Sequence, residues 1–314
     1  MKAIILYEYG GKLTVADAPI PDIKDDEVLV KVKNTAVNHL DTVEASGVAR
    51  AIFPIQLPWV PGHEFSGIVE KVGKSVASFK AGDAVLGNCP YGAYAEYIAV
   101  KKGLIVKKPK NLSFAEAATV PVASQTAWQA IFDHGHLSMG QTILIHGGAG
   151  AVGAYAVQLA HDKGARVIVT ASNNDRNFLH TIGADQVIDY KTEKFEEEID
   201  GKVDVVFDLI GGDVQQRSYL VLKSGGYLIA ASQPVSQADA LKYKVTALLM
   251  NMTPSAERLS RIAKLLEEGK IKADVANIYP LENAAQAWQA ISGNLSGGQQ
   301  ALHGKLVLEV KKFD

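Results

Sequence analysis

The sequence predicts an α/β protein in which a doubly wound parallel sheet is joined to a smaller β-rich module. The first hundred residues contain strand-length runs of β-branched and aromatic residues, separated by Gly, Pro and Asp. From Gln141 onward, apolar strands alternate with helical segments, a pattern typical of βαβ units and of a sheet covered on both faces. A chain of 314 residues is long enough for two such domains.

The elements follow from local patterns taken in chain order. The strands expected in the β-rich module are 3–7, 27–33, 65–72 and 93–100. Ser113 and Glu116 have the spacing of a capping box, which predicts a helix start, and the helical stretch resumes after Pro121 as far as residue 132.

The second half is expected to hold the parallel sheet and its helices. Its strands are 142–146, 166–171, 186–190, 203–210 and 227–231, with 244–250 as a further edge strand. The helices between them are 151–163, 175–181 and 214–222. The segment 254–269 predicts a helix with Pro just inside its start and Gly at its end, and helix 282–291 precedes a final strand, 305–310.

Composition excludes several classes of protein. Lys and Arg number 32 against 34 for Asp and Glu, and this balance argues against a nucleic-acid binder. The single cysteine, Cys89, excludes a disulfide framework and a multi-cysteine metal site. The first residues predict a strand rather than a signal peptide, and no apolar run approaches the roughly 18 residues of a membrane span. We therefore expect a cytoplasmic protein.

The strongest chemical signal is a glycine motif after strand 142–146. Gly148, Gly150 and Gly153 have the G-x-G-x-x-G spacing between an apolar strand and an apolar helix. The first glycine is expected to permit the tight turn, the second to let a pyrophosphate approach, and the third to allow close helix–strand contact. The helix N-terminus supplies free N–H groups. The motif predicts dinucleotide binding, and a glycine-rich turn without a ligand is the alternative.

The residues after the next strand favour NADPH over NADH. An NAD site usually places a carboxylate about 20 residues after the motif, on the ribose 2′-hydroxyl. Here Ser172 stands at the strand end and Arg176 follows, where a guanidinium would attract a 2′-phosphate. Two alternatives stay open: Asp175 could reach the ribose, and Arg176 could be an ordinary solvated helix residue.

A second group of motifs makes the chain resemble the medium-chain dehydrogenase/reductase superfamily. They are Pro61-Gly62-His63-Glu64, Asn38-His39-Leu40-Asp41, the glycine motif and Gly304-Lys305-Leu306-Val307-Leu308. The resemblance spans almost the whole chain and is strongest to the zinc-free NADPH:quinone reductases and enone reductases. It implies a GroES-like catalytic domain of residues 1–117 and 256–314, a Rossmann NADP-binding domain of residues 118–255, and a cleft between them for nicotinamide and substrate.

The same resemblance argues against a catalytic zinc ion. Zinc-dependent members also carry His63 and Glu64, but their two cysteine ligands align with Asn38 and Val122. We therefore expect no metal and a neutral, hydrogen-bonding His63. An adventitious metal site that includes His39 and Asp41 beside His63 stays open.

The activity that the resemblance implies is zinc-independent hydride transfer from NADPH to quinones or α,β-unsaturated carbonyls. Such acceptors spread the developing charge, so the site mainly has to position the reactants. Asn38 is expected to contact the acceptor oxygen and Asp41 the nicotinamide ribose, with a local cap or turn contact as the alternative for Asp41. The expected cofactor-binding residues are Thr126, Gly148, Ala149, Gly150, Ala151, Val152, Gly153, Ser172, Asn173, Arg176, Tyr190, Ile210 and Ala230.

The sequence leaves two alternative functions open and also indicates an assembly. One alternative is an alcohol dehydrogenase of the same superfamily, and another is a non-catalytic NADPH-binding sensor. Val43 leaves room for the sensor, because related reductases commonly have Tyr or Lys there. Tyr190 has the alternative of an exposed strand-end tyrosine. The partner is expected to be a small molecule, not a nucleic acid or a membrane, and the resemblance implies a homodimer that pairs segment 244–250 across a two-fold axis.

Overall fold

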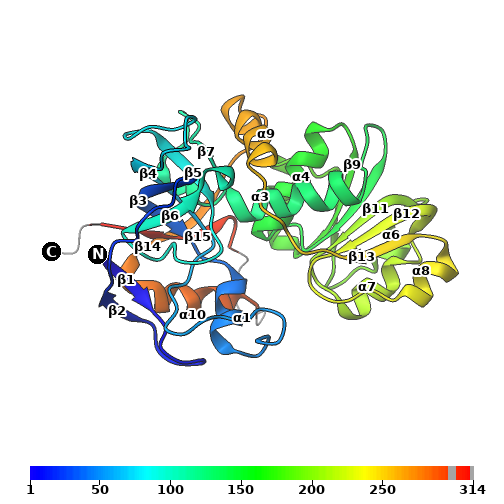
Figure 1. Cartoon of the computed structure of the whole chain (residues 1–314). Coiled ribbons are helices and arrows are strands. Elements are labelled where there is room, and N and C mark those ends of the chain that lie inside the picture. The colour runs from blue at the N-terminus through cyan, green and yellow to red at the C-terminus, as the bar shows by residue number, and fades with distance from the viewer. Residues whose placement is uncertain (296–301, 312–314) are drawn as a thin grey trace. The chain divides into compact units, whose positions relative to one another are not determined.

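The structure of the protein, a computed structural model, describes residues 1–295 and 302–311 (Figure 1). The chain divides into two compact units. Unit 1 contains Met1–Val122 and Pro254–Asp314, and unit 2 contains Ala123–Thr253. These boundaries lie a few residues from the domain limits expected from the sequence, at 117/118 and 255/256.

Unit 2 is built on a parallel sheet of six strands, all within the described part of the chain. Its order is β10-β9-β8-β11-β12-β13, so the chain starts in the middle and winds outward in both directions. This is the order typical of dinucleotide-binding domains. The strands are β8 (Thr142–His146), β9 (Arg166–Ala171), β10 (Gln186–Asp189), β11 (Val203–Asp208), β12 (Leu222–Ala230) and β13 (Thr246–Leu249).

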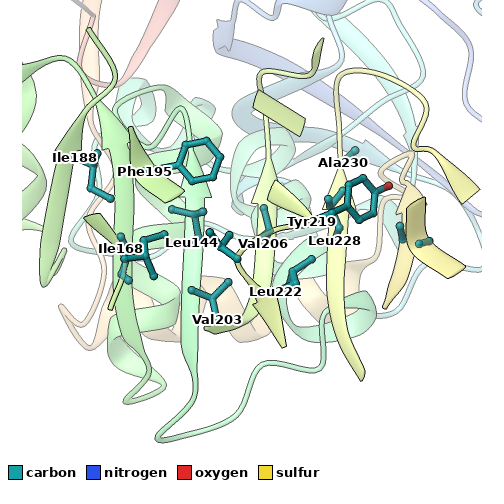
Figure 2. Packing of buried hydrophobic residues seen from close by; sticks show 14 residues of the cluster. Leu144, Ile168, Ile188, Phe195, Val203, Val206, Tyr219, Leu222, Leu228 and Ala230 are labelled. Atoms are coloured by element: carbon teal, nitrogen blue, oxygen red, sulfur yellow. The ribbon is translucent and has the colours of Figure 1, made fainter. Parts of the chain in front are cut away.

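Helices connect these strands and cover the sheet. They are α3 (Pro121–Trp128), the π-helical η2 (Gln129–His134), α4 (Ala151–Asp162), the 3-10 turn η3 (Asn173–Asp175), α5 (Arg176–Thr181), α6 (Phe195–Glu198), α7 (Gly212–Ser218) and α8 (Gln237–Tyr243). Alternate strand side chains share a face because the side-chain period of a strand is two. In Figure 2, one such face of neighbouring strands carries Leu144, Ile168, Ile188, Val206 and Leu228, buried together with Phe195 and Tyr219.

Unit 1 contains a second, mostly antiparallel sheet. Its order is β14-β15-β3-β4-β5-β7, with β6 also paired to β3, and β1 and β2 form a separate hairpin. The strands are β1 (Lys2–Ile5), β2 (Thr14–Asp17), β3 (Glu27–Ala36), β4 (Glu64–Val72), β5 (Ala84–Asn88), β6 (Tyr97–Lys101), β7 (Ile105–Lys107), β14 (Val275–Pro280) and β15 (Lys305–Glu309). The helices are α1 (His39–Ser46), η1 (Lys102–Leu104), α2 (Phe114–Ala118), α9 (Ala256–Glu267), η4 (Leu281–Asn283) and α10 (Ala284–Leu295).

The structure confirms the α/β class and the parallel sheet and corrects several local predictions. The helix expected over 214–222 ends at Ser218, and Leu222 already begins β12. Helix α1 lies inside the module that the sequence indicated to be β-rich. The segment 93–100 is a strand only from Tyr97 onward. Helix α9 does not begin at Pro254, because the Ser255 hydroxyl accepts a hydrogen bond from the Arg258 N–H and caps the helix.

Strand β13 lies at the edge of the parallel sheet and, among the described strands, pairs with β12 alone, which confirms the expected edge strand. None of the helices in residues 1–295 and 302–311 combines the length and the apolar composition that crossing a bilayer requires.

Candidate functional site

The carboxyl ends of the parallel strands bring most of the predicted cofactor-binding residues to one edge of the unit 2 sheet. The segments that follow or end β8, β9, β10, β11 and β12 carry, in that order, the glycine loop, Ser172 with Asn173 and Arg176, Tyr190, Ile210 and Ala230. Ligands of open α/β sheets bind at this edge. Thr126 is not at a strand end, since it lies on α3 of the same unit.

The glycine loop between β8 and α4 is compact because side chains would not fit at two of its positions. A Cβ atom on Gly148 would lie 2.1 Å from Val169 Cγ1, and one on Gly153 would lie 2.3 Å from the Gly147 carbonyl oxygen. The left-handed residue of the turn is Gly147, with φ of 77°, rather than Gly148. The turn-forming role predicted for Gly148 is therefore wrong, and that residue instead permits close contact with β9.

Gly150 is the N-cap of α4 and has room for a side-chain atom. Apart from neighbouring backbone, the one contact that a Cβ placed there would make with the described residues is with the Gly147 carbonyl oxygen, at 3.6 Å. No side chain caps the helix, so the first N–H groups of α4, which include those of Ala151, Val152 and Gly153, receive no side-chain cap. Such an end favours an anion through its N–H groups and the helix dipole. Ala149, by contrast, is buried within the loop.

Gly153→Ala is expected to destabilise the protein, although Gly→Ala inside a helix normally stabilises it. The added methyl group would meet two backbone groups, the Gly147 oxygen at 2.3 Å and the Gly148 Cα at 2.6 Å. Overpacking of this kind costs about 1–3 kcal/mol. Thermal unfolding would measure the loss, and Gly150→Ala is the matched control that should leave the midpoint nearly unchanged. Equal midpoints for both variants would contradict the packing role of Gly153.

The end of β9 presents polar groups and a cation. The Ser172 hydroxyl accepts a hydrogen bond from the Asn174 N–H at 3.4 Å, and Arg176 Nε donates to Asn173 Oδ1 at 3.0 Å. The guanidinium also lies 3.6 Å from the carboxylate of Glu193, with 38% of its side chain exposed. Asp175 is 2% exposed, which counts against it as the alternative ribose-binding carboxylate.

The remaining predicted positions at this edge differ in exposure. Tyr190 and Ile210 are 60% and 52% exposed, whereas Ala230 is fully buried and its carbonyl accepts a hydrogen bond from the Met250 N–H. The side chain of Ala230 therefore cannot contact a ligand at the surface. Asp208 was not predicted as a site residue, yet its buried carboxylate accepts hydrogen bonds from the N–H groups of Ile210 and Gly211 and holds this loop.

In unit 1, Asn38 belongs to a buried network around Glu64. Asn38 Nδ2 donates to Glu64 Oε1 at 3.0 Å, and the Val122 N–H donates to Glu64 Oε2 at 2.7 Å. The Lys305 ammonium donates to Asn38 Oδ1 at 2.7 Å and forms an ion pair with Glu64. Because an ammonium can only donate, this contact fixes which end of the Asn38 amide is the oxygen.

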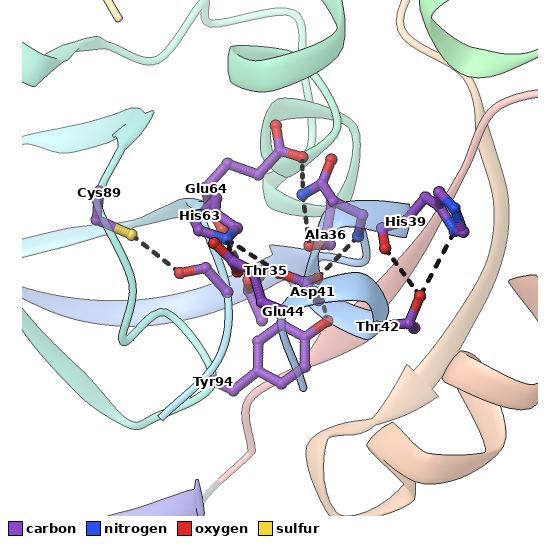
Figure 3. A network of polar contacts seen from close by, with 12 residues as sticks. Thr35, Ala36, His39, Asp41, Thr42, Glu44, His63, Glu64, Cys89 and Tyr94 are labelled. Atoms are coloured by element: carbon purple, nitrogen blue, oxygen red, sulfur yellow. Dashed lines mark hydrogen bonds and ion pairs between the residues drawn. The ribbon is translucent and has the colours of Figure 1, made fainter. Parts of the chain in front are cut away.

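Asp41 is also buried, and it caps helix α1. Its Oδ2 accepts hydrogen bonds from the Asn38 N–H at 2.9 Å and from the Tyr94 hydroxyl at 2.8 Å (Figure 3). The cap contact that was the alternative for Asp41 is thus present. Since none of the side chain is exposed, the geometry counts against direct contact with a ribose.

His63 lies beside Asp41 and Glu44. Burial lowers the pKa of His63, but the hydrogen bond that its Nε2–H donates to Glu44 and the charges of Asp41, Glu44 and Glu64 outweigh burial and raise the pKa above its usual value. This direction favours the protonated imidazole, and the neutral His63 expected from the sequence stays a prediction. Burial raises the pKa of Asp41, against the lowering effects of His63 and of its hydrogen-bond donors. His39 is exposed and bonds to Thr42 instead of joining this group.

Cys89 is not a candidate nucleophile. Burial, followed by the charges of Asp41 and Glu64, raises the pKa of its thiol well above the usual value. The thiol donates to the Gly62 carbonyl oxygen, so it is engaged in local packing.

Glu44, Tyr94 and Lys305 were not predicted as site residues. One signal in the sequence was available: a lysine within the apolar final strand, where a buried cation needs a partner. Glu44 follows Asp41 by three residues, a spacing that places both on one helix face only once α1 is recognised as a helix.

Comparisons with known proteins agree with this architecture. The model described as "Alcohol dehydrogenase GroES-like domain" matches residues 24–110, and "Zinc-binding dehydrogenase" matches residues 182–308. The NADPH-dependent alkenal/one oxidoreductase of Arabidopsis thaliana, named as chloroplastic, is 35% identical over 96% of this chain and 79% of its own length.

Two solved structures extend the comparison. The quinone oxidoreductase from Coxiella burnetii is 33% identical, with a TM-score of 0.89 and coverage of 99% of each chain. The Escherichia coli quinone oxidoreductase complexed with NADPH is 27% identical, with a TM-score of 0.87 and coverage of 98% of this chain and 100% of that chain.

Proposed function

This chain belongs to the medium-chain dehydrogenase/reductase superfamily, in its zinc-free quinone oxidoreductase branch, and on that premise we propose that it reduces quinones or α,β-unsaturated carbonyl compounds with NADPH. The observation that carries the proposal is the uncapped N-terminus of α4 behind the tightly packed glycine loop. A dinucleotide pyrophosphate is the ligand that this combination accommodates.

The residues present fit NADPH. The open position at Gly150 leaves space beside the α4 N–H groups for the pyrophosphate, and the guanidinium of Arg176 lies at the end of β9, where the 2′-phosphate of an adenosine would bind. Ser172 and Asn173 supply further polar groups there. When bound, NADPH supplies a hydride from its nicotinamide ring.

The family description implies a zinc ion, but the residues at positions 38 and 122, where zinc-dependent relatives carry cysteine ligands, do not fit one. Val122 has no ligand atom in its side chain, and its N–H is bonded to Glu64. The Asn38 amide is bonded to Glu64 and Lys305. We therefore derive no Lewis-acid step, and this chemistry favours a conjugated acceptor over an alcohol dehydrogenase reaction.

In the proposed site, Asn38 binds the acceptor oxygen through its amide. Its Oδ1 accepts from the Lys305 ammonium, which orients the amide and polarises its N–H donors. One of those donors makes only a long bond, 3.4 Å, to the Ala36 carbonyl, and it is the one that an acceptor could take over. Lys305 and Asp41 are positioning residues, since both are buried and act through Asn38.

Replacement of Arg176 by alanine is expected to weaken NADPH binding about 10- to 100-fold and to leave NADH binding unchanged. The reason is the loss of a charge-assisted hydrogen bond to the 2′-phosphate, worth about 1.5–3 kcal/mol. Fluorescence titration of both cofactors would measure the effect. Arg166→Ala is the matched control, because Arg166 lies at the other end of β9. An equal loss for both cofactors would contradict the assignment of Arg176.

We also propose that the protein is a homodimer in which β13 pairs with its symmetry mate. The exposed edge of β13, with Leu249 41% exposed, supports this assembly. A monomer mass from light scattering would contradict the proposed homodimer. The cytoplasmic location stays a proposal from the sequence.

The proposed activity is tested by NADPH oxidation with EDTA present, using one simple quinone and one 2-alkenal as acceptors. Turnover of either acceptor supports the proposal, and the faster acceptor identifies the substrate class. Saturable NADPH binding without turnover of either acceptor would favour the non-catalytic sensor.

A further inference from the structure

Helix α1 and the segment before β4 bring three ligand-type side chains together in unit 1. His63 Nε2 lies 2.7 Å from Glu44 Oε2 and 3.6 Å from Asp41 Oδ1 (Figure 3). One ligand atom from each residue lies within 4.8 Å of the other two. Asp41 and Glu44 are three residues apart in α1, so they share a helix face.

Asp41 Oδ1 is a buried oxygen that accepts no hydrogen bond from the described residues. Both hydrogen bonds to the Asp41 carboxylate end at Oδ2, whereas Oδ1 accepts none from residues 1–295 and 302–311, although the side chain is fully buried. Its ion-pair contact with His63 Nε2, at 3.6 Å, is too long for a hydrogen bond. A buried carboxylate oxygen without a donor is costly, and buried polar atoms in native proteins nearly always have a partner. This oxygen faces His63 rather than the Asn38 N–H.

The donor set suits a divalent transition metal. One imidazole nitrogen and two carboxylate oxygens are ligands of Zn²⁺ and its neighbours in the first row, and a dication would balance the two carboxylate charges. Ligands bound at about 2.0–2.1 Å in a tetrahedron lie about 3.3 Å apart, within the 2.7–3.6 Å separations that His63 makes here. The side chains of His63 and Glu44 are 14% and 10% exposed, so two of the three ligands touch solvent.

We propose that Asp41, Glu44 and His63 bind a divalent transition metal ion through Oδ1, Oε2 and Nε2. The ligand set shares His63 with the zinc position of zinc-dependent relatives but takes its other two ligands from Asp41 and Glu44 instead of positions 38 and 122. The bound ion ties α1 to the segment before β4 and supplies no step of the proposed reduction. The proposal therefore stands or falls independently of the proposed function.

The test is metal binding by the full-length chain after EDTA treatment and desalting. Titration with Co²⁺, followed by the visible absorption of the bound ion, and with Zn²⁺, followed by calorimetry, should reveal one site per chain. Glu44→Gln and His63→Gln should each weaken binding at least about tenfold. His39→Gln is the matched control on the same helix and should bind as the unsubstituted protein does.

Two results would overturn the proposal. One is the absence of saturable binding, which would leave a His63–Glu44 ion pair only. The other is equal affinity in Glu44→Gln, His63→Gln and the unsubstituted chain, which would place the ion elsewhere. Circular dichroism checks that each variant is folded. If His63→Gln does not fold, the metal affinity of Glu44→Gln alone tests the proposal. Turnover of the same samples in EDTA separates a failure of this site from a failure of the reductase proposal.

Discussion

Replacing Lys305 by methionine is expected to lower the free energy of unfolding of unit 1 by about 3–5 kcal/mol. The side chains of Lys305 and Glu64 are 5% and 0% exposed, so the substitution leaves the Glu64 carboxylate buried without its cation. The Asn38 amide loses its ammonium donor as well. Urea denaturation followed by tryptophan fluorescence in a Trp128→Phe background would report on unit 1 alone, because the other two tryptophans, Trp59 and Trp288, lie there.

Two comparisons separate the buried pair from a general effect of removing a lysine. Lys2→Met breaks the exposed pair with Asp17 in the same unit and should cost less than about 1 kcal/mol. The double variant Lys305→Met with Glu64→Gln should recover much of the loss, because no unpaired charge then remains buried. The pairing would be contradicted if the double variant lost as much free energy of unfolding as the two single variants lose together.

Acid is expected to destabilise unit 2 through His146, by about 1.4 kcal/mol for each pH unit below 6.5 and by about 3 kcal/mol at pH 4. Burial, helped by the charge of Arg217, lowers the pKa of His146 to about 4, against the opposing charges of Asp208 and Glu196. Between pH 6.5 and 4 the unfolded chain therefore binds a proton that the folded chain does not. The contribution of neutral His146 to the free energy of unfolding is fully present above its pKa in the unfolded chain and is lost as the pH falls toward its pKa in the folded chain.

The hydrogen bonds of His146 explain why it stays neutral. The single hydroxyl proton of Ser218 goes to the Val214 carbonyl at 2.7 Å, so His146 Nε2, at 2.9 Å, must donate to Ser218 Oγ. Nδ1 then accepts from the Thr170 hydroxyl at 2.9 Å. A proton on Nδ1 would force the Thr170 hydroxyl to change from donor to acceptor and would place a charge in the core.

His146→Gln should therefore be less stable at neutral pH yet lose less stability per pH unit between 6.5 and 4.5. Urea unfolding at several pH values, with Trp128 as the only tryptophan, measures this slope. The exposed His161, replaced by Gln, is the control whose slope should match that of the unsubstituted chain. An unchanged slope in His146→Gln would assign the acid sensitivity to other groups.

The parallel sheet could be predicted from the sequence because alternation of strands and helices leaves few topologies. The strands 142–146 and 166–171 agree with β8 and β9 residue for residue. The glycine motif located its loop but not the left-handed residue, because spacing alone does not separate a conformational requirement at Gly147 from a packing requirement at Gly148.

The polar networks of unit 1 could not be predicted in the same way. Asn38, Glu64 and Lys305 come from three distant segments, and only the pairing of β3 with β4 and β15 brings them together. Helix α1 is short, and strand signals surround it, so the shared face of Asp41 and Glu44 was hidden. The motif indicated that Asn38 and Asp41 are important, whereas their contacts required the tertiary structure.

The most direct test of the central claim is isotope transfer from NADPH that carries deuterium at both C4 positions. The reaction is run with a 2-alkenal in EDTA, and the product is examined by mass spectrometry and NMR. Metal-free hydride transfer predicts one deuterium per product, on the β-carbon, because that carbon accepts the hydride while the α-carbon takes a proton from water. A reduced product without deuterium on the β-carbon would contradict the account.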